Sequence, residues 1–133
     1  MTIQRVLFVC VGNSCRSQMA EAFARHHGLE AASSGTKPAS AVSSRAIEVM
    51  AEKGIDMTPE AGYHPKVLDW QGLQGFDRTI TMGCGVAESC PTLRTDEDWG
   101  LDDPVGQPLD VFRAVRDDIE RRVLQLKQTG TGL

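Results

Sequence analysis

The sequence lacks any apolar run that approaches the roughly 20 residues needed to cross a membrane. Its net charge of -4 leaves no basic stripe of the kind that binds nucleic acid, and its first residues lack the charged and apolar segments of an export signal. We therefore expect a cytoplasmic protein that contacts neither membrane nor nucleic acid. In that compartment its four cysteines stay reduced, and such cysteines are more often catalytic or metal-binding than structural.

Two common phosphate-binding motifs are also missing. No glycine-lysine-serine/threonine sequence follows a strand, which excludes a Walker loop, and the dinucleotide-binding glycine pattern is absent. No internal repeat or linker interrupts the 133 residues, of which 41% are hydrophobic. Because this is enough for a core without disulfides or metals, we expect one domain over residues 1–133, a monomer with no cofactor.

Strands and helices alternate in the hydrophobic pattern. Four segments are predicted as strands: Ile3–Val9, Glu30–Ser34, Asp77–Met82 and a weaker one around Trp99–Leu101. Helices are predicted between and after them: Arg16 to about Gly28, Ser43–Lys53, a short one within Pro65–Gly72, and one that begins near Pro108. The alternation predicts an α/β fold, an open parallel sheet of about four strands with helices on both faces. Ligands of such sheets bind outside the carboxyl ends of the strands.

The first predicted strand ends at Cys10, and a short polar loop leads to Arg16 and Ser17 at the start of a helix. Backbone N–H groups of such a loop and a helix N-terminus favour negative charge at one point, and an arginine fork matches two oxygens of a tetrahedral oxyanion. The residues expected to bind the oxyanion are Val11, Gly12, Asn13, Ser14, Cys15, Arg16 and Ser17. The same field favours the thiolate of Cys10, which can attack the central atom of the oxyanion. The alternative is a buried cysteine at a strand end beside a solvated arginine.

Two further cysteines, Cys84 and Cys90, follow the third predicted strand with five residues between them. Glycines on both sides of Cys84 predict a mobile segment, which suits a disulfide relay. Cys10 and Cys84 both lie at the carboxyl ends of predicted strands, so the topology places them on one rim of the sheet, where they could meet. A zinc site of Cys10, Cys15, Cys84 and Cys90 is a weaker alternative, because structural zinc sites favour about two to four residues between paired cysteines. Two unconnected small apolar side chains are the third interpretation.

Asp103 precedes Pro104, which restricts its backbone to an extended geometry. A carboxylic acid beside an oxyanion site can protonate the departing oxygen as a general acid. We therefore predict Asp103, rather than Asp102, as the acid; a turn aspartate without a catalytic role is the alternative. Cys15 is expected to point inward and to be structural.

Together these motifs resemble the thioredoxin-coupled arsenate reductases, which share a fold with the low-molecular-weight protein tyrosine phosphatases. The likeness covers most of the chain and rests on segments in the family order: Val11–Glu21, Ser33–Gly35, Gly54–Asp56, Cys90–Thr92 and Trp99–Pro104. The loop motif alone does not separate reductase from phosphatase. The cysteine pair favours the reductase.

The resemblance implies that arsenate binds in the loop and that Cys10 attacks arsenic while Asp103 acts as the acid. Cys84 then attacks Cys10, arsenite leaves, and Cys90 resolves the disulfide for reduction by thioredoxin or a similar dithiol. Asn13 and Ser17 would orient the loop and hydrogen-bond the Cys10 sulfur. Phosphate or sulfate would mimic arsenate, with weak phosphatase activity as a by-product. The alternative function is a phosphatase that forms a phospho-cysteine intermediate.

Three departures from the family pattern stand out. The interval between the last two cysteines is one residue shorter than in better-known members. Certain members bind potassium near Asn13, Glu21, a serine like Ser33 and a mid-chain aspartate, but this chain has Gly62-Tyr63-His64 where that aspartate stands, which argues against the site. Val105-Gly106 replaces the aromatic residues that phosphatases of this fold carry after the aspartate-proline pair.

Overall fold

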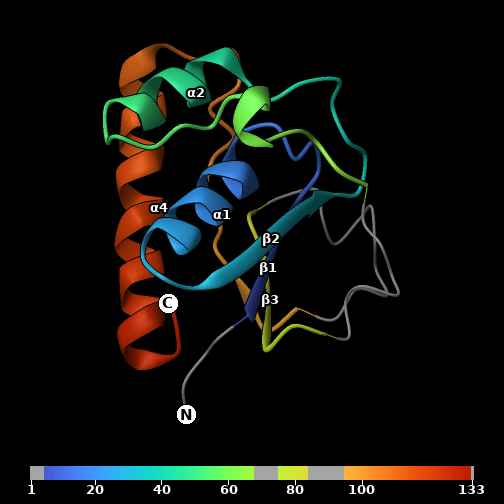
Figure 1. The fold of residues 1–133 in the computed structure, drawn as a ribbon, viewed down its shortest axis with the longest axis vertical. Coiled ribbons are helices and arrows are strands. Elements are labelled where there is room, and N and C mark those ends of the chain that lie inside the picture. Colours follow the sequence, from blue (N-terminus) through green and yellow to red (C-terminus); the bar gives the residue numbers. More distant parts are fainter. Residues whose placement is uncertain (1–4, 68–74, 84–94, 133) are drawn as a thin grey trace.

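The computed structural model describes residues 5–67, 75–83 and 95–132. Its sheet has four parallel strands in the order β2-β1-β3-β4. These strands are β1 (Arg5–Cys10), β2 (Glu30–Gly35), β3 (Arg78–Thr81) and β4 (Glu97–Asp98). The helices are α1 (Arg16–His26), α2 (Ser44–Ala51), the 3-10 helix η1 (Pro59–Ala61) and α4 (Leu109–Thr129). The predicted open parallel α/β sheet is confirmed (Figure 1).

β1 is central because its residues are apolar on both sides. Val6 and Phe8 are fully buried toward the helices, and Val9 is equally buried on the opposite face. Such doubly buried runs are typical of parallel sheets. The register pairs Cys10 with Gly35 and Val9 with Thr81. The carboxyl ends of three strands therefore meet beside the first loop.

The described α-helices, α1, α2 and α4, lie together on one face of the sheet (Figure 1). The predicted apolar stripe of the last helix is confirmed, because every one of its members is buried in the shared core: Phe112, Val115, Ile119, Val123 and Leu126. On the opposite face Leu7 and Val9 pack with Val11, Ala32 and Phe76. Helices were predicted on both faces of the sheet, whereas the α-helices of the described residues cover one face. The helix expected within Pro65–Gly72 lies mostly outside the described residues.

The fourth strand differs from its predicted position. Hydrophobicity predicted it at Trp99–Leu101, whereas the strand pairs two residues earlier, at Glu97–Asp98. Glu97 is buried because its carboxylate accepts hydrogen bonds from Trp99 Nε1 at 3.0 Å and from the Gly132 amide at 2.9 Å. The apolar residues that follow fill the core without extending the strand. Among the described residues, none of the helices combines the length and apolarity required to cross a membrane.

Candidate active site

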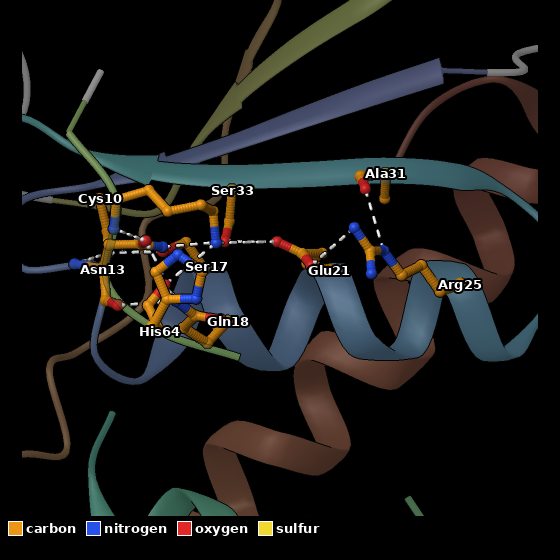
Figure 2. Close-up of polar contacts among 10 residues, drawn as sticks. Cys10, Asn13, Ser17, Gln18, Glu21, Arg25, Ala31, Ser33 and His64 are labelled. Atoms are coloured by element: carbon orange, nitrogen blue, oxygen red, sulfur yellow. Dashed lines mark hydrogen bonds and ion pairs between the residues drawn. The ribbon is translucent and has the colours of Figure 1, made fainter. Parts of the chain in front are cut away.

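The Cys10 thiol lies at the carboxyl end of β1, where the chain turns into the loop before α1 (Figure 2). The residue is 3% exposed. The Asn13 amide donates to Cys10 Sγ at 3.0 Å, and Ser17 Oγ lies 2.8 Å from the same sulfur. The Asn13 amide is thus directed at the sulfur and a hydroxyl lies beside it; hydrogen bonds donated to a sulfur favour its thiolate form.

The loop turns its carbonyl groups outward. Every carbonyl from residue 10 to residue 14 accepts a hydrogen bond, and the donors are the amides of Thr36, Lys37, Ala39 and Ser43 and the side chain of Gln18. In a planar trans peptide the N–H group points away from the preceding C=O group. The N–H groups of these peptides therefore point away from the segments that bind the carbonyls, and that of Asn13 points at Cys10 Sγ. Converging amides of this kind form anion-binding sites.

Two conformational requirements hold the loop in this shape. Asn13 has a φ of 51°, the left-handed region that asparagine tolerates better than most residues. Gly35 on β2 lies so close to the loop that a Cβ atom there would be 2.6 Å from the Val11 carbonyl oxygen. Neither feature is visible in a hydrophobicity pattern, although both residues belong to motifs noted in the sequence.

Arg16 connects the loop to two neighbouring segments. Its guanidinium is buried, and Nη1 donates to the carbonyls of Met82 at 2.8 Å and Leu101 at 2.9 Å. Nη2 lies 3.9 Å from Asp103 Oδ2. A guanidinium has five N–H donors in a planar fork, so these contacts fix its plane while leaving donors for a ligand.

Asp103 reaches the site from the loop after β4. Its side chain is 53% exposed, and Oδ1 accepts a hydrogen bond from the Val105 amide at 3.1 Å. This contact turns the other carboxylate oxygen toward Arg16. Cys10, Arg16 and Ser17 thus belong to the loop and the start of α1, and Asp103 lies beside Arg16; their catalytic roles stay a prediction.

Cys15 differs from Cys10 although it lies in the same loop. Burial raises the pKa of the Cys15 thiol well above its ordinary value, and the charges of Asp103 and Cys10 raise it further against the opposing effect of Arg16. Cys15 is 2% exposed and belongs to the core. This agrees with the predicted inward, structural position.

Behind Cys10 lies a buried polar cluster that the sequence motifs only partly indicated (Figure 2). Asn13 Nδ2 donates to Ser17 Oγ at 2.7 Å and to Ser33 Oγ at 2.9 Å, and Ser33 donates to Glu21 at 2.7 Å. Gln18, a fully buried polar residue of α1, donates to the Asn13 side chain. The role of Gln18 was missed; a glutamine on a buried helix was the only available signal.

The cluster does not fit a bound potassium ion. Asn13 Oδ1 already accepts the Lys66 amide at 2.8 Å and Gln18 Nε2 at 3.1 Å. The two carboxylate oxygens of Glu21 face Lys66 Nζ at 3.6 Å and Arg25 Nη2 at 3.1 Å. Over the part of the chain that the structure describes, no group of three or more histidine, cysteine, aspartate or glutamate side chains could hold a metal.

Cys84 and Cys90 lie outside the described residues, as does the zinc alternative that needs them. The residue before Cys84 is described. Gly83 has a φ of 126°, and a Cβ there would be 2.6 Å from the Leu101 carbonyl oxygen and 2.8 Å from Arg16 Nη1. Its amide donates to Asp98 at 3.1 Å. The chain therefore enters the Cys84 segment directly beside Arg16.

A family model described as low molecular weight phosphotyrosine protein phosphatase matches residues 5–130. An arsenate reductase of Staphylococcus aureus strain Newman is 35% identical over 133 residues, covering 96% of this chain and 98% of that protein. A solved arsenate reductase in its phosphate binding state is 38% identical, with a TM-score of 0.77, over 95% of this chain and 98% of that one. A low molecular weight protein tyrosine phosphatase from T. tengcongensis is 28% identical, with a TM-score of 0.82, over 94% and 98%. The predicted resemblance is confirmed, and the chain belongs to the low molecular weight phosphotyrosine protein phosphatase family.

Proposed function

We propose that the protein reduces arsenate to arsenite, with Cys10 as the nucleophile. The observation that carries this proposal is the sulfur of Cys10, which accepts the Asn13 amide and lies 2.8 Å from the Ser17 hydroxyl, at the start of a loop whose carbonyls bond to neighbouring segments. A thiolate beneath a set of amide donors can bind a tetrahedral oxyanion and attack its central atom. The likeness to arsenate reductases identifies arsenate as that oxyanion.

In the first step arsenate binds to the amides of residues 11–17 and to the free donors of Arg16. Cys10 Sγ forms a bond to arsenic, and one As–O bond breaks. Asp103, in its protonated form, gives its proton to the departing oxygen, which leaves as water. Its exposed position lets it regain a proton from solvent. The product is a thiol-arsenate adduct in which arsenic is still pentavalent.

The second step transfers two electrons. The Cys84 thiolate attacks Cys10 Sγ, and the electron pair of the S–As bond goes to arsenic, which leaves as trivalent arsenite. Cys90 then attacks Cys84, which frees Cys10 and leaves a Cys84–Cys90 disulfide. Thioredoxin or a similar dithiol supplies the two electrons that reduce this disulfide. We infer that the enzyme acts as a monomer. We also infer that it acts in the cytoplasm, where such a donor keeps its thiols reduced.

The second candidate function is phosphoester hydrolysis, which the family model and the phosphatase structures favour. Phosphate and arsenate are both tetrahedral, so the loop around Cys10 serves either anion. In a phosphatase, water rather than a second cysteine would attack the Cys10 adduct. Val105 and Gly106 supply no aromatic surface for a phosphotyrosine ring, so this activity is expected to be a side reaction.

The deciding experiment measures multiple-turnover arsenate reduction with thioredoxin, thioredoxin reductase and NADPH. Cys90→Ser is expected to abolish turnover while leaving hydrolysis of p-nitrophenyl phosphate intact, because only the relay needs the third thiol. If Cys84→Ser and Cys90→Ser both reduce arsenate at the normal rate, the relay is wrong. If the wild type hydrolyses the phosphate ester but reduces no arsenate, the phosphatase assignment replaces it.

A further inference from the structure

We propose that Lys66 is a positioning residue whose ammonium group balances the buried charge of Glu21, so that the hydrogen-bond chain behind Cys10 operates without a bound monovalent cation. The inference rests on the proposed role of Cys10 as a thiolate nucleophile. It adds a residue that touches neither the sulfur nor the oxyanion.

The direction of the hydrogen-bond chain follows from the inventory of donors. Asn13 Oδ1 accepts the amide of Lys66 and the side-chain amide of Gln18, so its Nδ2 must face the two serines. Nδ2 donates to Ser17 Oγ at 2.7 Å. Because a hydroxyl has one proton and Ser17 already accepts from Asn13, that proton is available to Cys10 Sγ at 2.8 Å. The chain therefore ends in a donor to the sulfur (Figure 2).

Glu21 fixes the other end of the chain. Asn13 Nδ2 donates to Ser33 Oγ at 2.9 Å, and Ser33 donates to Glu21 Oε1 at 2.7 Å. The Glu21 side chain is only 4% exposed, and an ionised carboxylate at such depth is costly unless it is paired. Without a countercharge, the negative charge of Glu21 would disfavour a second negative charge at Cys10.

Two cations face this carboxylate. Arg25 Nη2 lies 3.1 Å from Oε2, which is the oxygen turned away from Ser33. Lys66 Nζ lies 3.6 Å from Oε1, the oxygen that holds Ser33. Tyr63 is a further titratable neighbour; burial and the charge of Glu21 raise its pKa, so it stays neutral. Lys66 is therefore the positive charge at the carboxylate oxygen that holds the chain.

The backbone of Lys66 also contacts the hydrogen-bond chain. Its amide donates to Asn13 Oδ1, and its ammonium group donates to the His64 carbonyl at 3.1 Å. One residue thus orients the asparagine and neutralises the glutamate. The charged groups beside the loop of Cys10 are different: Arg16 and Asp103 lie 3.9 Å apart, and Cys15 is close enough for the charge of Cys10 to help raise its pKa. Changes at Lys66 are therefore expected to act on the sulfur through the hydrogen-bond chain.

The test uses the full chain with Cys84→Ser and Cys90→Ser, so that it does not depend on arsenate reduction. The rate of Cys10 alkylation by iodoacetamide is followed by peptide mass spectrometry at pH 7 and at pH 10. The ratio of the two rates reports the thiolate fraction, whereas general structural damage changes both rates. Lys66→Met is expected to lower this ratio by about threefold to tenfold, as removal of a nearby countercharge should. Lys66→Arg is expected to restore most of it.

Lys53→Met is the matched control, because Lys53 is similarly exposed and pairs with Glu120 at 3.0 Å away from the site. It should leave the ratio unchanged. The wild-type ratio should also be the same in potassium chloride and in tetramethylammonium chloride at equal ionic strength. An unchanged ratio in Lys66→Met, an equal fall in Lys53→Met, or a wild-type ratio that rises with potassium would each overturn the proposal. If Lys66→Met does not fold, the comparison of the two salts still tests the proposal, because it uses the wild-type lysine.

Discussion

Cys10 and Cys15 lie in the same loop and are almost equally buried, with exposures of 3% and 2%, yet their surroundings differ. The sulfur of Cys10 accepts a hydrogen bond from the Asn13 amide and lies 2.8 Å from the Ser17 hydroxyl. Burial and neighbouring negative charge raise the pKa of Cys15, so it stays protonated at neutral pH. We infer that donors directed at the sulfur, rather than depth in the protein, distinguish a reactive thiol from a structural one.

The largest effect is expected from removal of the reactive sulfur. Cys10→Ser should lower both arsenate reduction and phosphate-ester hydrolysis by at least about 1000-fold, because both reactions need a sulfur nucleophile. Steady-state assays of the two activities measure this loss. Retention of either activity would place the nucleophile elsewhere and remove the distinction between the two thiols.

Loss of a donor to Cys10 should have an intermediate effect. Ser17→Ala removes the hydroxyl that contacts the sulfur at 2.8 Å, and hydrogen bonds to charged groups are worth about 1.5 to 3 kcal/mol. We expect the rate of Cys10 alkylation at pH 7 to fall roughly 10- to 100-fold. At pH 10, where the thiol ionises without help, the rate should approach that of the wild type. A variant that reacts normally at pH 7 would show that Ser17 does not stabilise the thiolate.

A smaller effect is expected one step further along the chain. Ser33→Ala removes the link between Asn13 and Glu21 and should slow Cys10 alkylation at pH 7 by about threefold to tenfold, as for a neutral hydrogen bond. Ser34→Ala is the matched control, because Ser34 lies next on β2 and is also buried, while its hydroxyl has no hydrogen-bond partner among the described residues. Equal effects of the two substitutions would indicate that the strand, rather than the chain, controls the thiol.

The smallest effect is expected at the second thiol of the loop. Cys15→Ala should change arsenate reduction by less than about twofold while lowering the free energy of unfolding by about 1 kcal/mol, because a small buried side chain is lost and the backbone amide remains. Urea denaturation and the turnover assay measure the two quantities. A large loss of activity with unchanged stability would assign Cys15 a chemical role.

The sequence predicted much of this fold because its signals were local. The apolar run before Cys10 and the helical stripe of α4 both reflect burial along one element. β4 was misplaced because a buried glutamate forms part of it, held by Trp99 and by Gly132 from the far end of the chain. A contact over such a distance leaves no periodic signal.

The distinction between local signals and contacts of distant residues also applies to the candidate site. Cys10, Arg16 and Asp103 could be proposed as site residues from the sequence, because thiol, guanidinium and carboxyl groups at that spacing have a definite chemistry. Gln18 and Lys66 could not, because their importance depends on which carbonyl or carboxylate they meet in three dimensions. Lys66 in particular acts on a segment more than forty residues earlier in the chain.

The most direct measurement is competitive alkylation of the reduced protein at pH 7, mapped to individual cysteines by mass spectrometry, with and without arsenate. We predict that Cys10 is modified rapidly, that Cys15 remains unmodified in the folded protein, and that arsenate or phosphate protects Cys10. Modification of Cys15 as fast as Cys10, or no protection by either oxyanion, would contradict the central claim that the loop holds Cys10 as a thiolate beneath an oxyanion site.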